Sequence, residues 1–173
     1  MTLEDYDKLA RTYRNLADAS LNAKALFASD DFFAAKERML DPAEPVWMEG
    51  KYDAHGKWMD GWESRRKREQ GHDYCVVRLA EPGTIKAIDI YTRYFTGNYP
   101  PIASVDACCQ DTDPGTDTSW VEIVSSTPLE GDSHNLFEIE NEQVWSHLRL
   151  NIFPDGGVAR FRVFGEPGAN ASA

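Results

Sequence analysis

A long series of strand-like segments in the second half of the chain most constrains its fold. The segments are rich in β-branched and aromatic residues, and turns containing glycine and proline separate them. They cover residues 74–79, 84–95, 103–109, 120–125, 135–139, 147–153 and 158–164. Because few helices interrupt them, the series favours an antiparallel sandwich over a parallel α/β sheet. We predict an all-β fold, either an antiparallel β-sandwich or a jelly roll, with short peripheral helices.

The last two of these segments show the clearest alternation of apolar and polar residues, on either side of a glycine-rich turn. This alternation predicts a pair of strands with one core face and one strongly polar face. A solvated outer sheet surface explains the polar face, and an anion-binding face is the alternative. The cations available for it are Arg149, Arg160 and Arg162.

The first forty residues predict the peripheral elements. Apolar residues recur at spacings of three and four over residues 2–14, which indicates an amphipathic helix. A brief strand is expected at residues 24–28. A second short helix is expected to follow Asp30 or Asp31 and to end before Pro42.

The net charge and the cysteines limit which binding partners and which cellular compartment we expect for the chain. Eighteen Lys and Arg against 29 Asp and Glu give 18 − 29 = −11, which disfavours nucleic acids and anionic membrane surfaces as partners. The apolar runs are too short to span a bilayer, and the acidic amino terminus is unlike a secretory signal, so we expect a cytoplasmic protein. Cys75, Cys108 and Cys109 predict reduced thiols. No motif predicts a metal or another cofactor.

Two strings concentrate groups that could do chemistry. Residues 59–73, MDGWESRRKREQGHD, place acids, arginines and a histidine around a tryptophan within a stretch of long ordered loops. Residues 94–101, YFTGNYPP, form a rigid turn after a strand that could present Asn98 to a ligand. A solvated charged loop and a purely structural turn are the plainer interpretations.

Several long strings together resemble the repeat of the allantoicase family. They occur in the family's order and span most of the chain: NLADASL from Asn15, ASDDFF from Ala28, GKWMDGWESRRKREQGHDYCVVRL from Gly56, FTGNYPP from Phe95 and HLRLNIFPDGGVARFRVFGEP from His147. The resemblance implies a galactose-binding-like jelly roll over residues 15–167. Residues 1–14 would then be a helical extension and residues 168–173 a flexible tail.

The resemblance also implies an activity and an assembly. Family members usually carry two such repeats and release urea from allantoate, leaving ureidoglycolate in purine degradation. This chain contains one repeat, similar to the first of the pair, so a homodimer or a larger homo-oligomer is expected. It also has Tyr91 before Thr92, where the family usually has an acidic residue.

Urea release needs groups that move protons. Within the string that the resemblance singles out, our hypothesis assigns proton transfer to Glu63 and His72, with Asp60 or Asp73 orienting the imidazole. The plainer alternative for Asp60 is a turn with Gly61.

The substrate also needs groups that hold it. Arg65 or Arg66 would bind the substrate carboxylate, and Asn98 would bond a ureido group. Trp62 and Tyr91 complete the candidate binding residues. The arginines could instead be surface charge, and Trp62 could simply fill the core.

Three other functions remain open at this point. The chain could act on another ureido or guanidino carboxylate. It could be a diverged enzyme with different chemistry on the same scaffold, or a non-catalytic module that binds a small molecule or carbohydrate, because fold does not fix function.

Overall fold

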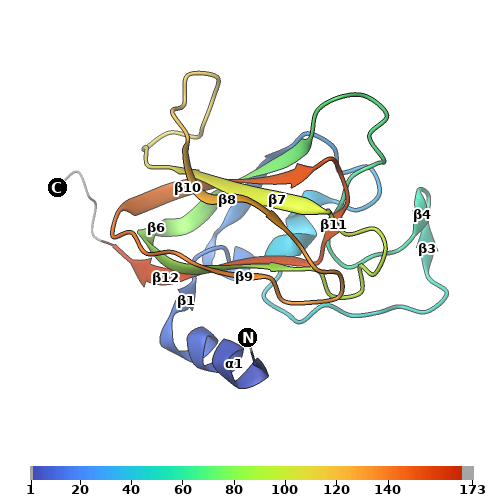
Figure 1. Cartoon of the computed structure of the whole chain (residues 1–173), viewed down its shortest axis with the longest axis horizontal. Coiled ribbons are helices and arrows are strands. Elements are labelled where there is room, and N and C mark those ends of the chain that lie inside the picture. Colours follow the sequence, from blue (N-terminus) through green and yellow to red (C-terminus); the bar gives the residue numbers. More distant parts are fainter. Residues whose placement is uncertain (1, 169–173) are drawn as a thin grey trace.

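The computed structural model describes residues 2–168, and two layers of antiparallel strands make up most of it (Figure 1). The elements in chain order are α1 (Leu3–Thr12), β1 (Arg14–Asn15), η1 (Ala19–Leu21), β2 (Lys24–Ala28), η2 (Lys36–Leu40), β3 (Tyr52–Asp53), β4 (Gly56–Lys57), β5 (Trp62–Glu63), β6 (Asp73–Tyr91), β7 (Ile102–Cys108), β8 (Val121–Pro128), β9 (Leu136–Glu138), β10 (Val144–Phe153), β11 (Gly157–Val158) and β12 (Arg160–Pro167). The strand expected at residues 24–28 is confirmed.

Strand β6 belongs to both layers. Its first part pairs with β2 and β10, in the layer that β7 and β8 complete. Its second part pairs with β9 and β12, and β1 adds to β12. The sequence predicts two strands separated by a Glu-Pro-Gly turn, but the strand continues through Gly83, which pairs with both Trp145 and Pro167. Pro82 and Gly83 therefore mark a bend from one layer to the other instead of a chain reversal.

The two layers enclose one main core. Apolar side chains on alternate positions of the long strands point inward, as period-two alternation requires. Fully buried examples are Ile85, Ile88, Ile90, Leu148, Leu150, Ile152, Phe161 and Val163. The predicted all-β class rests on this alternation and is confirmed.

The last two strands do not pair with each other. Strand β6 lies between β10 and β12, so the glycine-rich segment that joins these two strands crosses between layers. The expected polar sheet surface is also wrong for β12, because Arg160 and Arg162 are only 1% and 6% exposed. Their face of the sheet is covered by α1 and by the loop that precedes β5 (Figure 1).

A buried ion pair fixes that loop on β12. The guanidinium of Arg160 donates to the Asp60 carboxylate at 3.0 Å and to the carbonyl of Ala43 at 2.8 Å. The same carboxylate accepts the backbone N–H of Val46 at 2.9 Å. Asp60 thus has a structural role that the sequence did not reveal.

The peripheral helices are shorter than predicted. Helix α1 begins at a capping box made by Thr2 and Asp5, and Tyr6 is its buried residue. The second helix is confined to the 3₁₀ turn η2, because Phe33 and Ala34 donate backbone hydrogen bonds to the carbonyl of Glu63 instead of starting a helix. Within residues 2–168, no helix is long and apolar enough to cross a membrane.

Removing the Asp60 carboxylate should destabilise the fold strongly. Asp60→Ala leaves the buried Arg160 guanidinium without its anion, which costs about 3 kcal/mol or more of unfolding free energy. Glu81→Ala is the matched control, because it breaks the exposed pair with Arg14 and costs no more than about 1 kcal/mol. Urea denaturation measures both, and equal losses would contradict a structural role for Asp60.

Candidate functional site

Four chain segments at one end of the sandwich form a cleft of about 530 Å³. It is lined by Phe33, Glu63, Ser64, Arg66, Lys67, Gly97, Asn98, Tyr99, Pro101, Pro154, Asp155 and Gly156. A smaller cavity of about 190 Å³ shares Phe33, Glu63 and Asn98 with the cleft. Glu63 and Asn98 therefore stand where the two spaces meet.

Glycine residues allow these loops to touch through their backbones. Gly157 pairs with Glu63 in the β5–β11 ladder, and its N–H donates to the carbonyl of Asn98 at 2.8 Å. A Cβ at Gly157 would overlap the ring of Phe95, and a Cβ at Gly156 would lie 2.7 Å from the backbone nitrogen of Pro100. Larger residues would push apart the backbones that present Glu63 and Asn98.

The loop that carries Asn98 begins at a residue whose backbone has the left-handed conformation. Tyr94 has φ +72°, a conformation that bulky residues rarely adopt. Asp132 stabilises it by accepting the backbone N–H of Tyr94 and a guanidinium N–H of Arg93, both at 2.9 Å. The surrounding contacts thus maintain local strain at the edge of the candidate site.

The cleft contains a carboxyl group suited to carrying a proton. Asn98 Nδ2 donates to Glu63 Oε2 at 3.0 Å. Burial raises the pKa of Glu63, the Asn98 hydrogen bond opposes that rise, and the nearby charge of Asp155 adds to it. Because the net shift is upward, Glu63 retains its proton at higher pH than an ordinary glutamate does.

Arg66 is the cation best placed to meet an anionic ligand in the cleft. It is exposed, lines the cleft, and forms no ion pair within residues 2–168. Arg65 instead donates to Asp30 at 2.8 Å. Lys67 contacts the buried carboxylate of Asp73 at 3.3 Å. The sequence leaves open whether Arg65 or Arg66 binds the substrate carboxylate, and these contacts favour Arg66.

His72 does not line this cleft. Its Nε2 lies 3.3 Å from Asn151 Oδ1, and its ring packs 4.5 Å from that of Phe153. The reason is alternation: Asp73 begins β6 and points inward, so His72 points to the outer face of the sheet. Within the described chain, neither Asp60 nor Asp73 contacts the imidazole. The predicted orientation of His72 by either carboxylate is therefore wrong.

Trp62 and Tyr91 also lie away from the cleft. Trp62 is fully buried and donates from Nε1 to the carbonyl of Asp30 at 2.8 Å, so it belongs to the core. Tyr91 stacks on His134 with ring centroids 3.8 Å apart, and its hydroxyl donates to Glu44 at 3.2 Å. As placed here, neither side chain can contact a ligand bound beside Glu63.

The structure adds cleft residues that sequence reasoning missed. Asp155 lies in the glycine-rich turn between the last two predicted strands, yet its charge acts on Glu63 and its carboxylate accepts the N–H of Lys67 at 2.7 Å. Phe33 forms an apolar wall. Both lie in strings that resemble the family, and that was the one available signal. Within residues 2–168, no three His, Cys, Asp or Glu side chains gather as a metal site.

Comparison with known proteins identifies the family. The family model described as the allantoicase repeat matches residues 14–168. A probable allantoicase from Photobacterium profundum is 59% identical over 159 residues, covering 91% of this chain and 48% of the relative. A probable allantoicase 2 from Burkholderia mallei is 58% identical over 158 residues, covering 91% of this chain and 47% of the relative. The chain thus spans about half the length of the curated relatives it matches.

Solved structures support the same family and fold. The allantoicase of Saccharomyces cerevisiae is 27% identical with a TM-score of 0.80, over 95% of this chain and 54% of that one. A CBM32 module from Clostridium perfringens, 14% identical, has a TM-score of 0.64 over 86% of this chain and 94% of that one. The latter likeness concerns the fold alone and confirms the galactose-binding-like jelly roll. On the match over residues 14–168 and the identity to these relatives, the chain belongs to the allantoicase family.

Proposed function

We propose that the chain carries a hydrolytic site that releases urea from allantoate and leaves ureidoglycolate. The observation that carries the proposal is the half-buried Glu63, hydrogen-bonded to Asn98 and facing a cleft that Arg66 lines. Membership of the allantoicase family supplies the reaction, and relatives named as probable allantoicases support it.

Substrate binding follows from the chemistry of the cleft walls. Allantoate has one carbon that bears a carboxylate and two ureido groups. The guanidinium of Arg66 matches the carboxylate with two parallel hydrogen bonds. The amide of Asn98 offers both a donor and an acceptor to a ureido group. These contacts hold the carbon that reacts beside Glu63.

Glu63 provides both proton transfers. The protonated carboxyl donates its proton to the nitrogen of the departing ureido group. The lone pair of the remaining ureido nitrogen forms a carbon–nitrogen double bond as the other C–N bond breaks, so urea leaves. Water then attacks the same carbon, and the Glu63 carboxylate takes a proton from it. The balance is allantoate plus water to ureidoglycolate plus urea, with Glu63 restored.

Tyr91 stands where the family usually has an acidic residue, but this difference does not remove a side chain from the Glu63 cleft. Tyr91 lies outside the cleft, so the tyrosine leaves Glu63, Asn98 and Arg66 in place. This location favours retained urea-releasing chemistry over a diverged reaction. An activity on another ureido or guanidino carboxylate would use the same three side chains.

We also propose a domain organisation, an assembly and a cellular location for the chain. Residues 15–167 act as the repeat and residues 1–14 as an extension to it. The chain works as a homodimer or larger homo-oligomer, in which one repeat packs on the repeat of a second copy. A cytoplasmic location agrees with Cys75, Cys108 and Cys109, which are all free thiols.

Replacing the acid should slow turnover strongly while leaving the fold intact. Glu63→Gln keeps the side-chain shape and removes the proton that reaches the leaving nitrogen, so kcat for urea release should fall about 10²- to 10⁴-fold. Glu122→Gln, at an exposed position of β8, is the matched control. Urea released from allantoate is measured, with circular dichroism to confirm folding. A Glu63→Gln variant as fast as the wild type would refute the assignment.

The role of Arg66 should appear in substrate affinity. Arg66→Gln removes a charge-assisted contact worth roughly 1.5–3 kcal/mol, so KM for allantoate should rise about tenfold to a hundredfold. Arg68→Gln removes a neighbouring charge that does not line the cleft, and its KM should stay near that of the wild type. Steady-state kinetics compare the two. Equal effects would indicate general charge attraction instead of a specific contact.

The charge of Asp155 should move the alkaline limit of activity, which burial of Glu63 mainly sets. Glu63 must be protonated to act, so kcat falls as pH rises through its raised pKa. Asp155→Asn removes the like charge and lowers that pKa, while the amide oxygen still accepts the Lys67 N–H. The fall in kcat should therefore begin at lower pH than in the wild type. An unshifted profile, with exposed Asp117→Asn as control, would show that Asp155 does not act on Glu63.

A further inference from the structure

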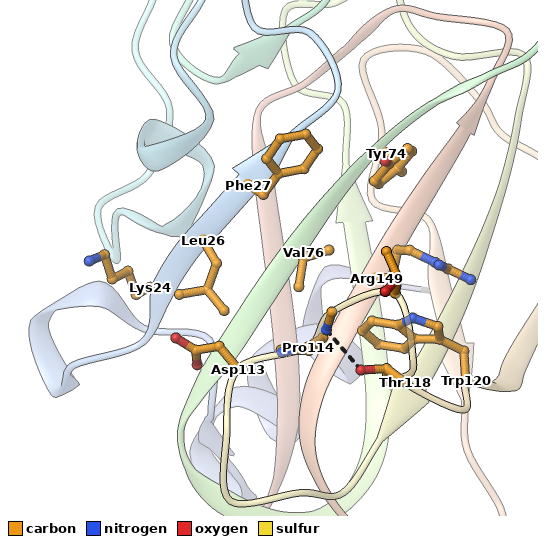
Figure 2. Close-up of a pocket in the computed structure, with 12 residues that line it drawn as sticks. Lys24, Leu26, Phe27, Tyr74, Val76, Asp113, Pro114, Thr118, Trp120 and Arg149 are labelled. Atoms are coloured by element: carbon orange, nitrogen blue, oxygen red, sulfur yellow. Dashed lines mark hydrogen bonds between the residues drawn. The ribbon is translucent and has the colours of Figure 1, made fainter.

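A second, larger cavity lies on the outer face of the layer that contains β2, β6 and β10. It has a volume of about 860 Å³ and shares no lining residue with the Glu63 cleft. Figure 2 shows its walls: Phe27 and Tyr74 on one side, and the loop from Asp113 to Trp120 on the other. Its size is within the range of cavities that enclose a small-molecule ligand.

The aromatic lining of this groove is unusual for the outer face of a sheet. Such faces are ordinarily polar, yet Phe27 is 52% exposed here, with the ring of Tyr74 beside it at 5.8 Å. Across the groove, the Arg149 guanidinium lies 4.6 Å from the ring of Trp120. Two hydrogen bonds to Asp106, at 3.1 and 2.9 Å, fix that guanidinium. The Trp120 ring is therefore held in place before any ligand arrives.

The rim of the groove offers both donors and acceptors. Thr118 Oγ1 accepts the N–H of Gly115 at 2.9 Å, which leaves its hydroxyl hydrogen free to donate. Asp113 Oδ1 contacts His147 Nε2 at 3.2 Å, and its Oδ2 has no hydrogen bond within residues 2–168. Lys24 is exposed and likewise forms no ion pair in the described chain. A ligand in this groove meets flat apolar surfaces together with hydrogen-bonding groups of both kinds.

We propose that this groove is a carbohydrate-binding site, separate from the cleft, that takes a short neutral oligosaccharide. A sugar ring has a flat face of C–H groups that packs on an aromatic ring, and an edge of hydroxyls that both donate and accept. Within residues 2–168, Tyr74 and Trp120 form no ring pair with each other, and they lie on separate walls, so they offer two platforms along an open groove. Successive sugar units fit that arrangement.

Two other ligand classes fit less well. A planar aromatic molecule is best held in a slot between two parallel rings, and these rings do not form one. A polyanionic glycan would be repelled by the formal net charge of −11. The neutral saccharide is the class that uses the rings, the hydroxyl of Thr118 and the free oxygen of Asp113 together.

Isothermal titration calorimetry with three neutral probes, cellotriose, mannotriose and tri-N-acetylchitotriose, tests the proposal on the full chain. At least one of these probes should bind with a dissociation constant below about 1 mM. Trp120→Ala should weaken that binding about tenfold or more, and Trp120→Phe should restore most of it because a ring remains. Trp47→Ala is the matched control, since Trp47 is 41% exposed and does not line the groove. Glu63→Gln should leave sugar binding unchanged, which separates this site from the proposed hydrolysis.

Three results would overturn the proposal. The first is no heat of binding from any of the three trisaccharides at millimolar concentration with folded protein. The second is unchanged affinity in Trp120→Ala. The third is a fall in the mass measured by light scattering for Trp120→Ala without a change in sugar binding, which would assign the groove to contact with a second copy of the chain.

Discussion

Backbone contact between glycines and neighbouring loops holds the candidate site together. At Gly61, a Cβ would overlap the carbonyl oxygen of Val158 and lie 2.7 Å from the Cα of Ala159. Gly156 and Gly157 come equally close to the loop that carries Asn98. Since no side chain separates these backbones, the β5–β11 ladder and the hydrogen bond from the Gly157 N–H to the Asn98 carbonyl place Glu63 and Asn98 within hydrogen-bond distance. The geometry of the cleft depends on this close approach of the backbones.

The charges around the cleft divide into two groups, those already paired and those left for a ligand. Arg65 forms an ion pair with Asp30, Lys67 with Asp73, and Arg160 with Asp60. Arg66 keeps no such partner within residues 2–168. Paired charges fix the loops, whereas the unpaired guanidinium retains its full binding capacity. One short, highly charged string thus supplies both the framework and the recognition of an anion.

Sequence reasoning found which residues belong to strands better than it found their partners. Alternation places Leu150 and Phe161 on the core face, where both are fully buried, because inward and outward positions repeat every two residues. The same alternation could not show that β6 separates β10 from β12, since partner choice depends on distant chain segments. Arg160 therefore looked solvated in sequence, although a loop from far along the chain covers it.

The candidate site shows the same limit. The sequence indicates which side chains could do chemistry, but not which of them lie in one cleft. Glu63 and His72 are nine positions apart in one charged string, and both carry groups suited to proton transfer. The start of β6 at Asp73 turns His72 to the opposite side of the sheet, where it meets Asn151. The residues that remain in the cleft, Glu63, Asn98 and Arg66, all come from one repeat. The proposed proton transfer by Glu63 and the proposed contacts of Asn98 and Arg66 with the substrate therefore need no side chain from a second repeat or a second copy.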